Sequence, residues 1–147
     1  MNEDAVRHQR LAAFKLLANA GTRISSLLSE YLIGNFDIGI NEWRVILFAE
    51  KSEGQTIGDV CKHAKIYKSV VSRAIQHLEA KGLLAVTRTN RNVRIALSPE
   101  GRIFLAHVKP IVQEKEEELM GGISADDAKL LEQTLRRIAS NLDKFDK

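Results

Sequence analysis

The alternation of apolar and polar positions from Lys68 to Gly82 predicts an amphipathic helix. Five apolar residues recur at the spacing of a single helix face: Val70, Val71, Ala74, Ile75 and Leu78. The opposite face is small, polar and basic: Ser69, Ser72, Arg73 and Gln76. Each of these four side chains can hydrogen-bond to a phosphate or a base edge, and none is acidic. The face suits nucleic acid, although an ordinary amphipathic helix with a polar wet side has the same pattern.

The period changes from that of a helix to that of a strand after Gly82, a residue suited to the left-handed turn that ends a helix. Apolar residues alternate with small or polar ones on both sides of the polar turn TNRN at 89–92. The pattern predicts a two-stranded ribbon with Arg88 and Arg91 near its tip. A small basic helix face followed by a basic ribbon indicates a winged helix that binds DNA.

Two shorter helices are expected before this amphipathic helix. Asn41 can cap a helix over 42–50. Thr56 and Asp59 have the spacing of a capping box, which predicts a helix over 57–64. Because about three residues join this second helix to the amphipathic one, the pair has the helix-turn-helix arrangement.

Long apolar stripes lie near both ends of the chain. Residues 3–32 form one predicted helix, ended by Gly34 and Asn35, and its length of about 44 Å exceeds what a small domain needs. Another helix is predicted from Pro99 to about Met120. The last helix carries a heptad seam of apolar residues: Leu131, Leu135, Ile138, Leu142 and Phe145. Such stripes can pack within one chain, but their length favours a dimer.

Composition excludes several classes of protein. With 44% hydrophobic and 28% charged residues, the 147-residue chain has an ordinary globular composition and enough length for one domain with a core. No apolar run approaches the roughly 20 residues of a membrane span, and the N-terminus lacks the apolar core of a signal peptide. The single cysteine, Cys61, leaves no intrachain disulfide. We therefore expect a cytoplasmic protein that makes no contact with a membrane.

Positive charge is concentrated in one segment. Residues 60–95 contain eight Lys or Arg residues and a single acid, Glu79, for a net charge of +7. The whole chain carries only +3, so the other residues sum to −4. A basic segment within a mildly acidic chain indicates a polyanionic partner, and double-stranded DNA is the partner that this pattern favours.

The order and spacing of these segments resemble the MarR (multiple antibiotic resistance regulator) family of winged-helix transcription regulators. The resemblance covers nearly the whole chain. Its most specific pieces are W-R-V at 43–45, S-x-x-S-R at 69–73, L-E-x-K-G-L at 78–83 and L-S-P-E-G at 97–101.

The resemblance implies one domain over 1–147, mainly α with a small β-ribbon. A winged helix-turn-helix at about 41–98 would be flanked by N- and C-terminal dimerisation helices at 3–33 and 99–147. The family pattern also implies a homodimer whose terminal helices interlock. It implies a palindromic operator and release from DNA by a small ligand or an oxidant.

The resemblance further implies that a recognition helix from about Lys68 to Lys81 enters the major groove and that a wing from about Leu84 to Leu97 reaches the minor groove. The expected DNA contacts are Lys68, Ser69, Ser72, Arg73, Gln76, Arg88, Asn90 and Arg91.

Chemistry divides these residues by role. A guanidinium can bridge guanine O6 and N7, which suits Arg73, and Gln76 can pair with adenine. Lys68, Ser69 and Ser72 suit phosphates, which fix register. Arg91 suits a narrow minor groove of strong negative potential. Arg88 and Arg94 are expected to contact phosphates or to remain solvated charges.

The wing departs from the family pattern at one position. Family wings often carry Asp-x-Arg at the tip, whereas here Thr89 stands at the position of the acid and Arg91 keeps the arginine. Because the acid normally braces that arginine, the resemblance does not predict the geometry of this wing.

A pocket for a small effector of unknown identity is expected where the dimerisation helices meet the winged helix. Its candidate lining residues are Phe14, Trp43, Arg44 and Phe104, and Trp43 is at least as well explained as core. Cys61 falls on the inward face of its helix, where a small buried hydrophobe is expected rather than an oxidant sensor.

No cofactor, metal site or catalytic activity is predicted. The spacing of Cys61 and the four histidines matches no standard zinc pattern. The nucleophile elbow, the P-loop, H-E-x-x-H and G-x-G-x-x-G are all missing from the sequence.

The leading hypothesis is a dimeric DNA-binding transcription regulator, with a repressor favoured over an activator. The alternative is a winged-helix dimer that serves as a protein-interaction module and does not bind DNA. The departure at the wing allows the alternative, whereas the net charge of +7 over 60–95 argues against it.

Overall fold

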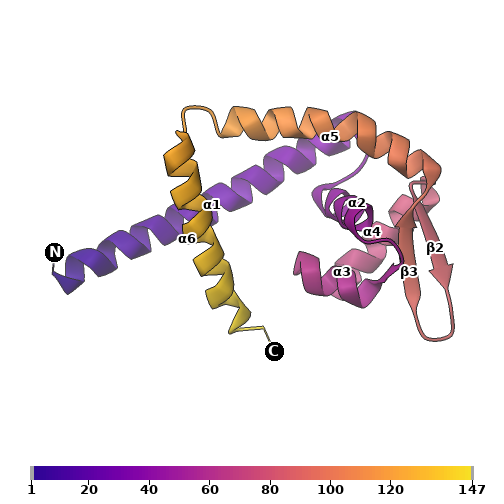
Figure 1. Ribbon diagram of the computed structural model, residues 1–147, viewed down its shortest axis with the longest axis horizontal. Coiled ribbons are helices and arrows are strands. Elements are labelled where there is room, and N and C mark those ends of the chain that lie inside the picture. The colour runs from indigo at the N-terminus through magenta and orange to yellow at the C-terminus, as the bar shows by residue number, and fades with distance from the viewer. Residues whose placement is uncertain (1, 147) are drawn as a thin grey trace. The chain divides into compact units, whose positions relative to one another are not determined.

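The computed structural model describes residues 2–146 and is mainly helical with a small antiparallel sheet (Figure 1). The order of elements among these residues is α1 (Glu3–Phe36), α2 (Ile40–Lys51), β1 (Gln55–Thr56), α3 (Ile57–Ala64), α4 (Lys68–Ala80), β2 (Leu84–Arg88), β3 (Val93–Leu97), α5 (Pro99–Leu119) and α6 (Ala125–Asp143). This confirms the predicted fold class. The described chain divides between Val108 and Lys109 into two compact units, and the single domain over 1–147 stays a prediction.

The first unit contains the winged helix-turn-helix. Helices α2, α3 and α4 pack together, and the sheet has the order β1-β3-β2. The hairpin has the register that the alternating pattern requires, with Leu84 opposite Leu97 and Val86 opposite Ile95. The apolar face of α4 is buried as predicted: Val71, Ala74, Ile75 and Leu78. Burial of this face fixes which side of α4 remains on the surface.

The starts of α3 and α4 agree with the sequence, whereas the junction between α1 and α2 differs. Helix α1 continues through Gly34 and Asn35, because a glycine in a helix interior costs only about 1 kcal/mol. It ends at Phe36, and the C-cap residue Asp37 has a left-handed φ of +55°. Helix α2 then begins at Ile40, so Asn41 lies inside it, and the backbone N–H of Gly39 donates to Glu42 Oε2 at 2.7 Å.

Strand β1 was not predicted. It has only two residues, too few to show a period, and it pairs with β3 through Gln55–Ile95 and Thr56–Arg94. Thr56 also serves as the expected cap of α3, because its side chain accepts from the N–H of Asp59 at 3.2 Å.

The L-S-P-E-G motif closes the wing onto the next helix. Ser98 Oγ donates to the carbonyl of Gly82 at 2.5 Å and accepts from the N–H of Gly101 at 2.9 Å. Gly82 itself has a φ of +74° and ends α4, with the N–H of Leu83 bonded to the carbonyl of Leu78 at 3.0 Å. A Cβ at position 101 would stand 2.0 Å from the carbonyl oxygen of Leu83, so only glycine fits there.

Gly101→Ala is therefore expected to destabilise the fold, because backbone must move to admit the methyl group. We expect a loss of about 3 kcal/mol and a fall in Tm of roughly 10 °C, measured by circular dichroism. Gly21→Ala is the matched control, since a Cβ there meets no atom within 4 Å and alanine is the better helix former. A Tm for Gly101→Ala equal to that of the wild type would contradict the close approach.

Large apolar side chains remain exposed on the terminal helices. On α1 they include Leu11, Phe14, Leu16, Ile24 and Leu27. On α6, which belongs to the second unit, they include Leu130, Leu131, Leu135 and Leu142, followed by Phe145. Ser124 caps α6 by accepting from the N–H of Asp127 at 3.1 Å. No helix within residues 2–146 combines the length and the apolar character that crossing a membrane requires.

Candidate nucleic-acid interface

The outer face of α4 is polar and open. Lys68, Ser69, Arg73 and Gln76 are exposed, and Ser72 is half-buried. Within the described chain, the side chains of Lys68 and Arg73 have no hydrogen-bond or ion-pair partner. The sequence placed Ser69, Ser72, Arg73 and Gln76 on one helix face, and in the structure these four residues lie on α4 with Lys68 at its first position.

Arg88 is engaged by α4. Its guanidinium donates to both carboxylate oxygens of Glu79, at 2.9 and 2.5 Å. The two residues therefore form a bidentate ion pair between β2 and α4. The pair lowers the pKa of Glu79 and raises that of Arg88. Arg88 was expected to contact phosphate or to remain solvated; in this structure its first role is to tie the wing to α4.

This ion pair predicts an acid-dependent loss of stability. Because the pKa of Glu79 is lowered in the folded state, its contribution is present at neutral pH and is lost as the pH falls below about 4.5, the ordinary value for glutamate. Glu79→Gln is expected to lower Tm at pH 7 by no more than a few degrees, because the pair is largely exposed.

The measurement is Tm from pH 7 to pH 3, and the difference between variant and wild type should shrink toward zero at the acid end. Glu117→Gln, at an exposed residue without a described ion pair, controls for the loss of a carboxyl group. A difference that does not change with pH would show that Glu79 acts through something other than its charge.

The wing turn is closed by Thr89 in place of the missing acid. Its hydroxyl accepts from the N–H of Asn92 and donates to the carbonyl of Asn92, both at 3.2 Å, and its own N–H donates to the same carbonyl at 2.9 Å. Asn90 and Arg91 lie at the tip of this turn and are exposed. Arg91 has no partner among the described residues. The turn is therefore ordered without an acid, and its arginine is free.

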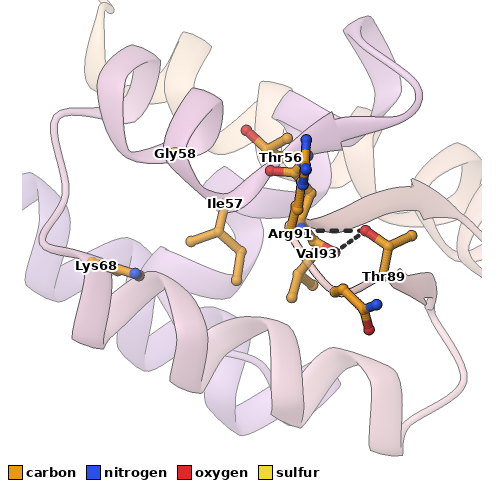
Figure 2. A pocket seen from close by; sticks show the side chains of 9 residues that line it. Thr56, Ile57, Gly58, Lys68, Thr89, Arg91 and Val93 are labelled. Carbon is orange, nitrogen blue, oxygen red and sulfur yellow. Dashed lines mark hydrogen bonds between the residues drawn. The ribbon is translucent and has the colours of Figure 1, made fainter.

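A hollow of about 470 Å³ lies between the wing turn and the starts of α3 and α4 (Figure 2). Lys68 borders it from α4, Thr56, Ile57 and Gly58 border it from the start of α3, and residues 89–93 border it from the wing. Two cations from different elements, Lys68 and Arg91, thus line one hollow, and no acid is among its lining residues. Such a site attracts an anion.

Arg94 differs from the arginines at the tip. Its guanidinium donates to the carbonyl of Gly54 at 2.7 Å, which links β3 to the loop before β1. Arg94 was expected to contact phosphate or to remain solvated, and in this structure it is bonded to the backbone. The sequence carried no signal for this contact, because the partner is a carbonyl 40 residues away.

The four candidate effector residues differ in their surroundings in this structure. Phe14 is 64% exposed on α1, and Trp43 is 4% exposed in the core. Phe104 packs edge-on against Phe36, with ring centroids 6.1 Å apart. Arg44 borders a hollow of about 500 Å³ with residues 47, 48, 51, 52, 63 and 64, none of which was a candidate. The effector pocket stays a prediction.

Cys61 is a free thiol, half-buried on α3. Over residues 2–146, no group of three or more His, Cys, Asp or Glu side chains is placed to hold a metal ion.

Comparison with known proteins gives one family. Residues 36–94 match the model of the MarR family. The HTH-type transcriptional regulator Hpr of Shouchella clausii is 32% identical over 74 residues, a stretch that spans 48% of this chain and 38% of that regulator. The names of these relatives indicate regulators and not enzymes.

Solved structures share the fold over most of the chain. A MarR/EmrR family regulator from Acinetobacter has a TM-score of 0.79 at 23% identity, with 98% of this chain and 99% of that one covered. Streptococcus pneumoniae FabT, solved in complex with DNA, has a TM-score of 0.72 at 22% identity and coverage of 94% and 99%. Bordetella bronchiseptica BpsR, whose DNA binding is regulated by 6-hydroxynicotinic acid, has a TM-score of 0.75 at 23% identity and coverage of 86% and 92%.

Proposed function

We propose that this chain, whose residues 36–94 match the model of the MarR family of transcription regulators, is a dimeric repressor that binds a palindromic operator and is released by a small ligand. The proposal extends the coarser conclusion, a DNA-binding regulator, to a mechanism. Its alternative, a protein-interaction module, loses its main support because Thr89 closes the wing turn without the missing acid.

One observation carries the proposal: the cations of α4 and the wing fall into two groups. Lys81, Arg88 and Arg94 are bonded within the protein. Lys68, Arg73 and Arg91 have no partner in the described chain and lie on the outer face of α4 and around the hollow at the wing. Paired cations stabilise a fold, whereas a connected group of unpaired cations is the electrostatic footprint of a nucleic-acid site.

The proposed contacts follow from this geometry. Helix α4 lies in the major groove, where Arg73 bridges guanine O6 and N7 and Gln76 pairs with adenine. Ser69 and Ser72 bond to phosphates and fix the register. Arg91 enters the adjacent minor groove. The sugar–phosphate strand between the two grooves passes over the hollow, where Lys68 meets it.

Dimerisation and release complete the proposal. The exposed apolar stripes of α1 and α6 are surfaces that a second copy of the chain would bury. Two recognition helices would then meet half-sites about 34–36 Å apart, which requires a palindromic operator. Ligand release is proposed by analogy with BpsR, whose regulation by 6-hydroxynicotinic acid is established for that protein.

The experiment is fluorescence anisotropy of the purified protein on the intergenic DNA upstream of its own gene and on a scrambled duplex, at two salt concentrations. We expect specific binding to exceed non-specific binding by at least about a thousandfold, and both to weaken steeply with salt. Absence of binding to either duplex at low salt would refute DNA binding and would favour the alternative function, a protein-interaction module.

A further inference from the structure

Two carboxylates at the junction of α1 and α2 hold the second half of α4. Asp37 caps the C-terminal end of α1, and its Oδ2 accepts from Lys81 Nζ at 2.6 Å. Glu42 lies in the first turn of α2, and its Oε1 is 2.7 Å from His77 Nδ1. Because a carboxylate oxygen only accepts, the imidazole nitrogen is the donor in this contact.

The two contacts act on one flank of α4. His77 and the C-cap residue Lys81 are four residues apart and therefore lie above one another on the helix. His77 directly follows Gln76 and is one turn beyond Arg73, so the flank adjoins the outer face that the proposed DNA contacts occupy. Movement of the flank that carries His77 and Lys81 would therefore rotate the outer face that carries Arg73 and Gln76.

Glu42 joins α4 to α2 through a single carboxylate. Its second oxygen, Oε2, accepts from the N–H of Gly39 at 2.7 Å and so caps α2. The Glu42 side chain is 17% exposed and its partner His77 is 45% exposed, so this contact is partly shielded from water, whereas Lys81 is 23% exposed and its partner Asp37 is 81% exposed. Lys81 also lowers the pKa of Asp37, which keeps that carboxylate charged. Partial burial strengthens the Glu42–His77 contact and fixes its geometry, and the Asp37–Lys81 pair adds a second, more exposed tie.

We propose that these two pairs, Asp37–Lys81 and Glu42–His77, form a junction clamp that sets the orientation of α4 from the end of α1 and so positions Arg73 and Gln76 for specific DNA. The inference rests on the proposed function. The opposite flank of α4 is already held by the Glu79–Arg88 pair. All three pairs hold the second half of α4, whereas Lys68 and Arg73 in the first half have no described partner.

The clamp is expected to affect recognition more than folding. The apolar face of α4 provides burial energy, which is non-directional, while polar pairs at its flanks specify one arrangement. Partly exposed ion pairs contribute little to stability. Because α1 also carries one of the apolar faces proposed to dimerise, the clamp connects the end of a dimerisation helix to the DNA-reading helix.

The test is the double variant Asp37→Asn and Glu42→Gln. Asparagine tolerates the left-handed backbone at position 37, and glutamine keeps an oxygen for the N–H of Gly39. Binding is measured by anisotropy on a duplex that the wild type selects from a random pool and on a scrambled duplex. Glu53→Gln, which breaks the ion pair with Arg102 away from α4, is the matched control.

The clamp and simple electrostatics predict opposite signs. Removing two carboxylates beside a DNA-binding surface raises its positive charge, so electrostatics alone predicts tighter binding to both duplexes. The clamp predicts that the double variant binds the selected duplex about tenfold more weakly, with the scrambled duplex bound at least as tightly as before. Lys81→Arg should preserve the preference, and Lys81→Met should reduce it.

Circular dichroism establishes that each variant is folded, and Lys81→Met tests the clamp without altering the junction if the double variant fails to fold. A folded variant whose preference for the selected duplex is within twofold of wild type overturns the clamp and leaves the proposed function standing. A wild-type protein that shows no preference for its selected duplex overturns both.

Discussion

Arg73→Ala is expected to lower affinity for the specific duplex by about fivefold to 150-fold, and to change affinity for a scrambled duplex much less. The range is that of a lost bidentate arginine–guanine contact, about 1–3 kcal/mol. Arg73 is exposed on α4 and has no described partner, so its removal costs the fold little. Anisotropy on both duplexes, at two salt concentrations, measures the effect.

Arg102→Ala, which removes an arginine of α5 together with its ion pair to Glu53, controls for the loss of one positive charge outside α4 and the wing. The slope of log affinity against log salt concentration, the salt slope, distinguishes a base contact of Arg73 from a phosphate contact. A base contact changes specificity and leaves the slope almost unaltered, whereas a phosphate contact lowers the slope by about 1 and weakens all sequences alike. Equal losses on both duplexes would assign Arg73 to the backbone of the DNA and exclude base reading.

The helices and the hairpin were predictable because their signals are local. Helix α4 begins at Lys68, two residues before its 3.6-residue apolar period starts at Val70, and Gly82 supplies the left-handed residue that follows its end. The change to a period of two located both strands of the wing. A pattern repeated over several residues identifies an element even when each residue is weakly informative.

The junction between α1 and α2 was not predictable in the same way. Gly34 and Asn35 are common helix terminators, but Ile38 is buried and α1 continues until Asp37. A tertiary contact overrides a local preference of about 1 kcal/mol. Strand β1 was missed for a related reason, because two residues form a strand only by pairing with β3.

Side-chain partners separated along the chain lie outside any local pattern. Glu79 and Arg88 are nine residues apart, Glu42 and His77 are 35 apart, and Asp37 and Lys81 are 44 apart. The sequence favoured Arg73 and Arg91 for base and minor-groove contacts and left Arg88 and Arg94 as phosphate contacts or solvated charges, but it could not show that Arg88 and Arg94 are bonded within the protein. The arginines without a described partner, Arg73 and Arg91, are the more informative about function, because they mark the surface proposed to bind DNA.

The exposed seam of α6 leads to the other large expected effect. Leu131 and Leu135 are one turn apart on α6, and both are exposed in the single chain. If a second copy of the chain covers this seam, a charge in its centre must be desolvated without a partner, which opposes association. The double variant Leu131→Glu and Leu135→Glu is therefore expected to be monomeric by sedimentation equilibrium at concentrations where the wild type is a dimer.

Loss of the dimer should remove most of the specific affinity. A monomer binds one half-site only. In a dimer, binding of the first half-site holds the second recognition helix close to the second half-site, and this raises the affinity about 10²- to 10⁴-fold. The monomer loses this gain. Gln133→Glu adds one negative charge, against two in the seam variant, at an exposed position of α6 away from the seam, and should remain dimeric with full affinity. A seam variant that stays dimeric would show that this chain assembles through another surface, and the exposed apolar stripe of α1 would be the next candidate.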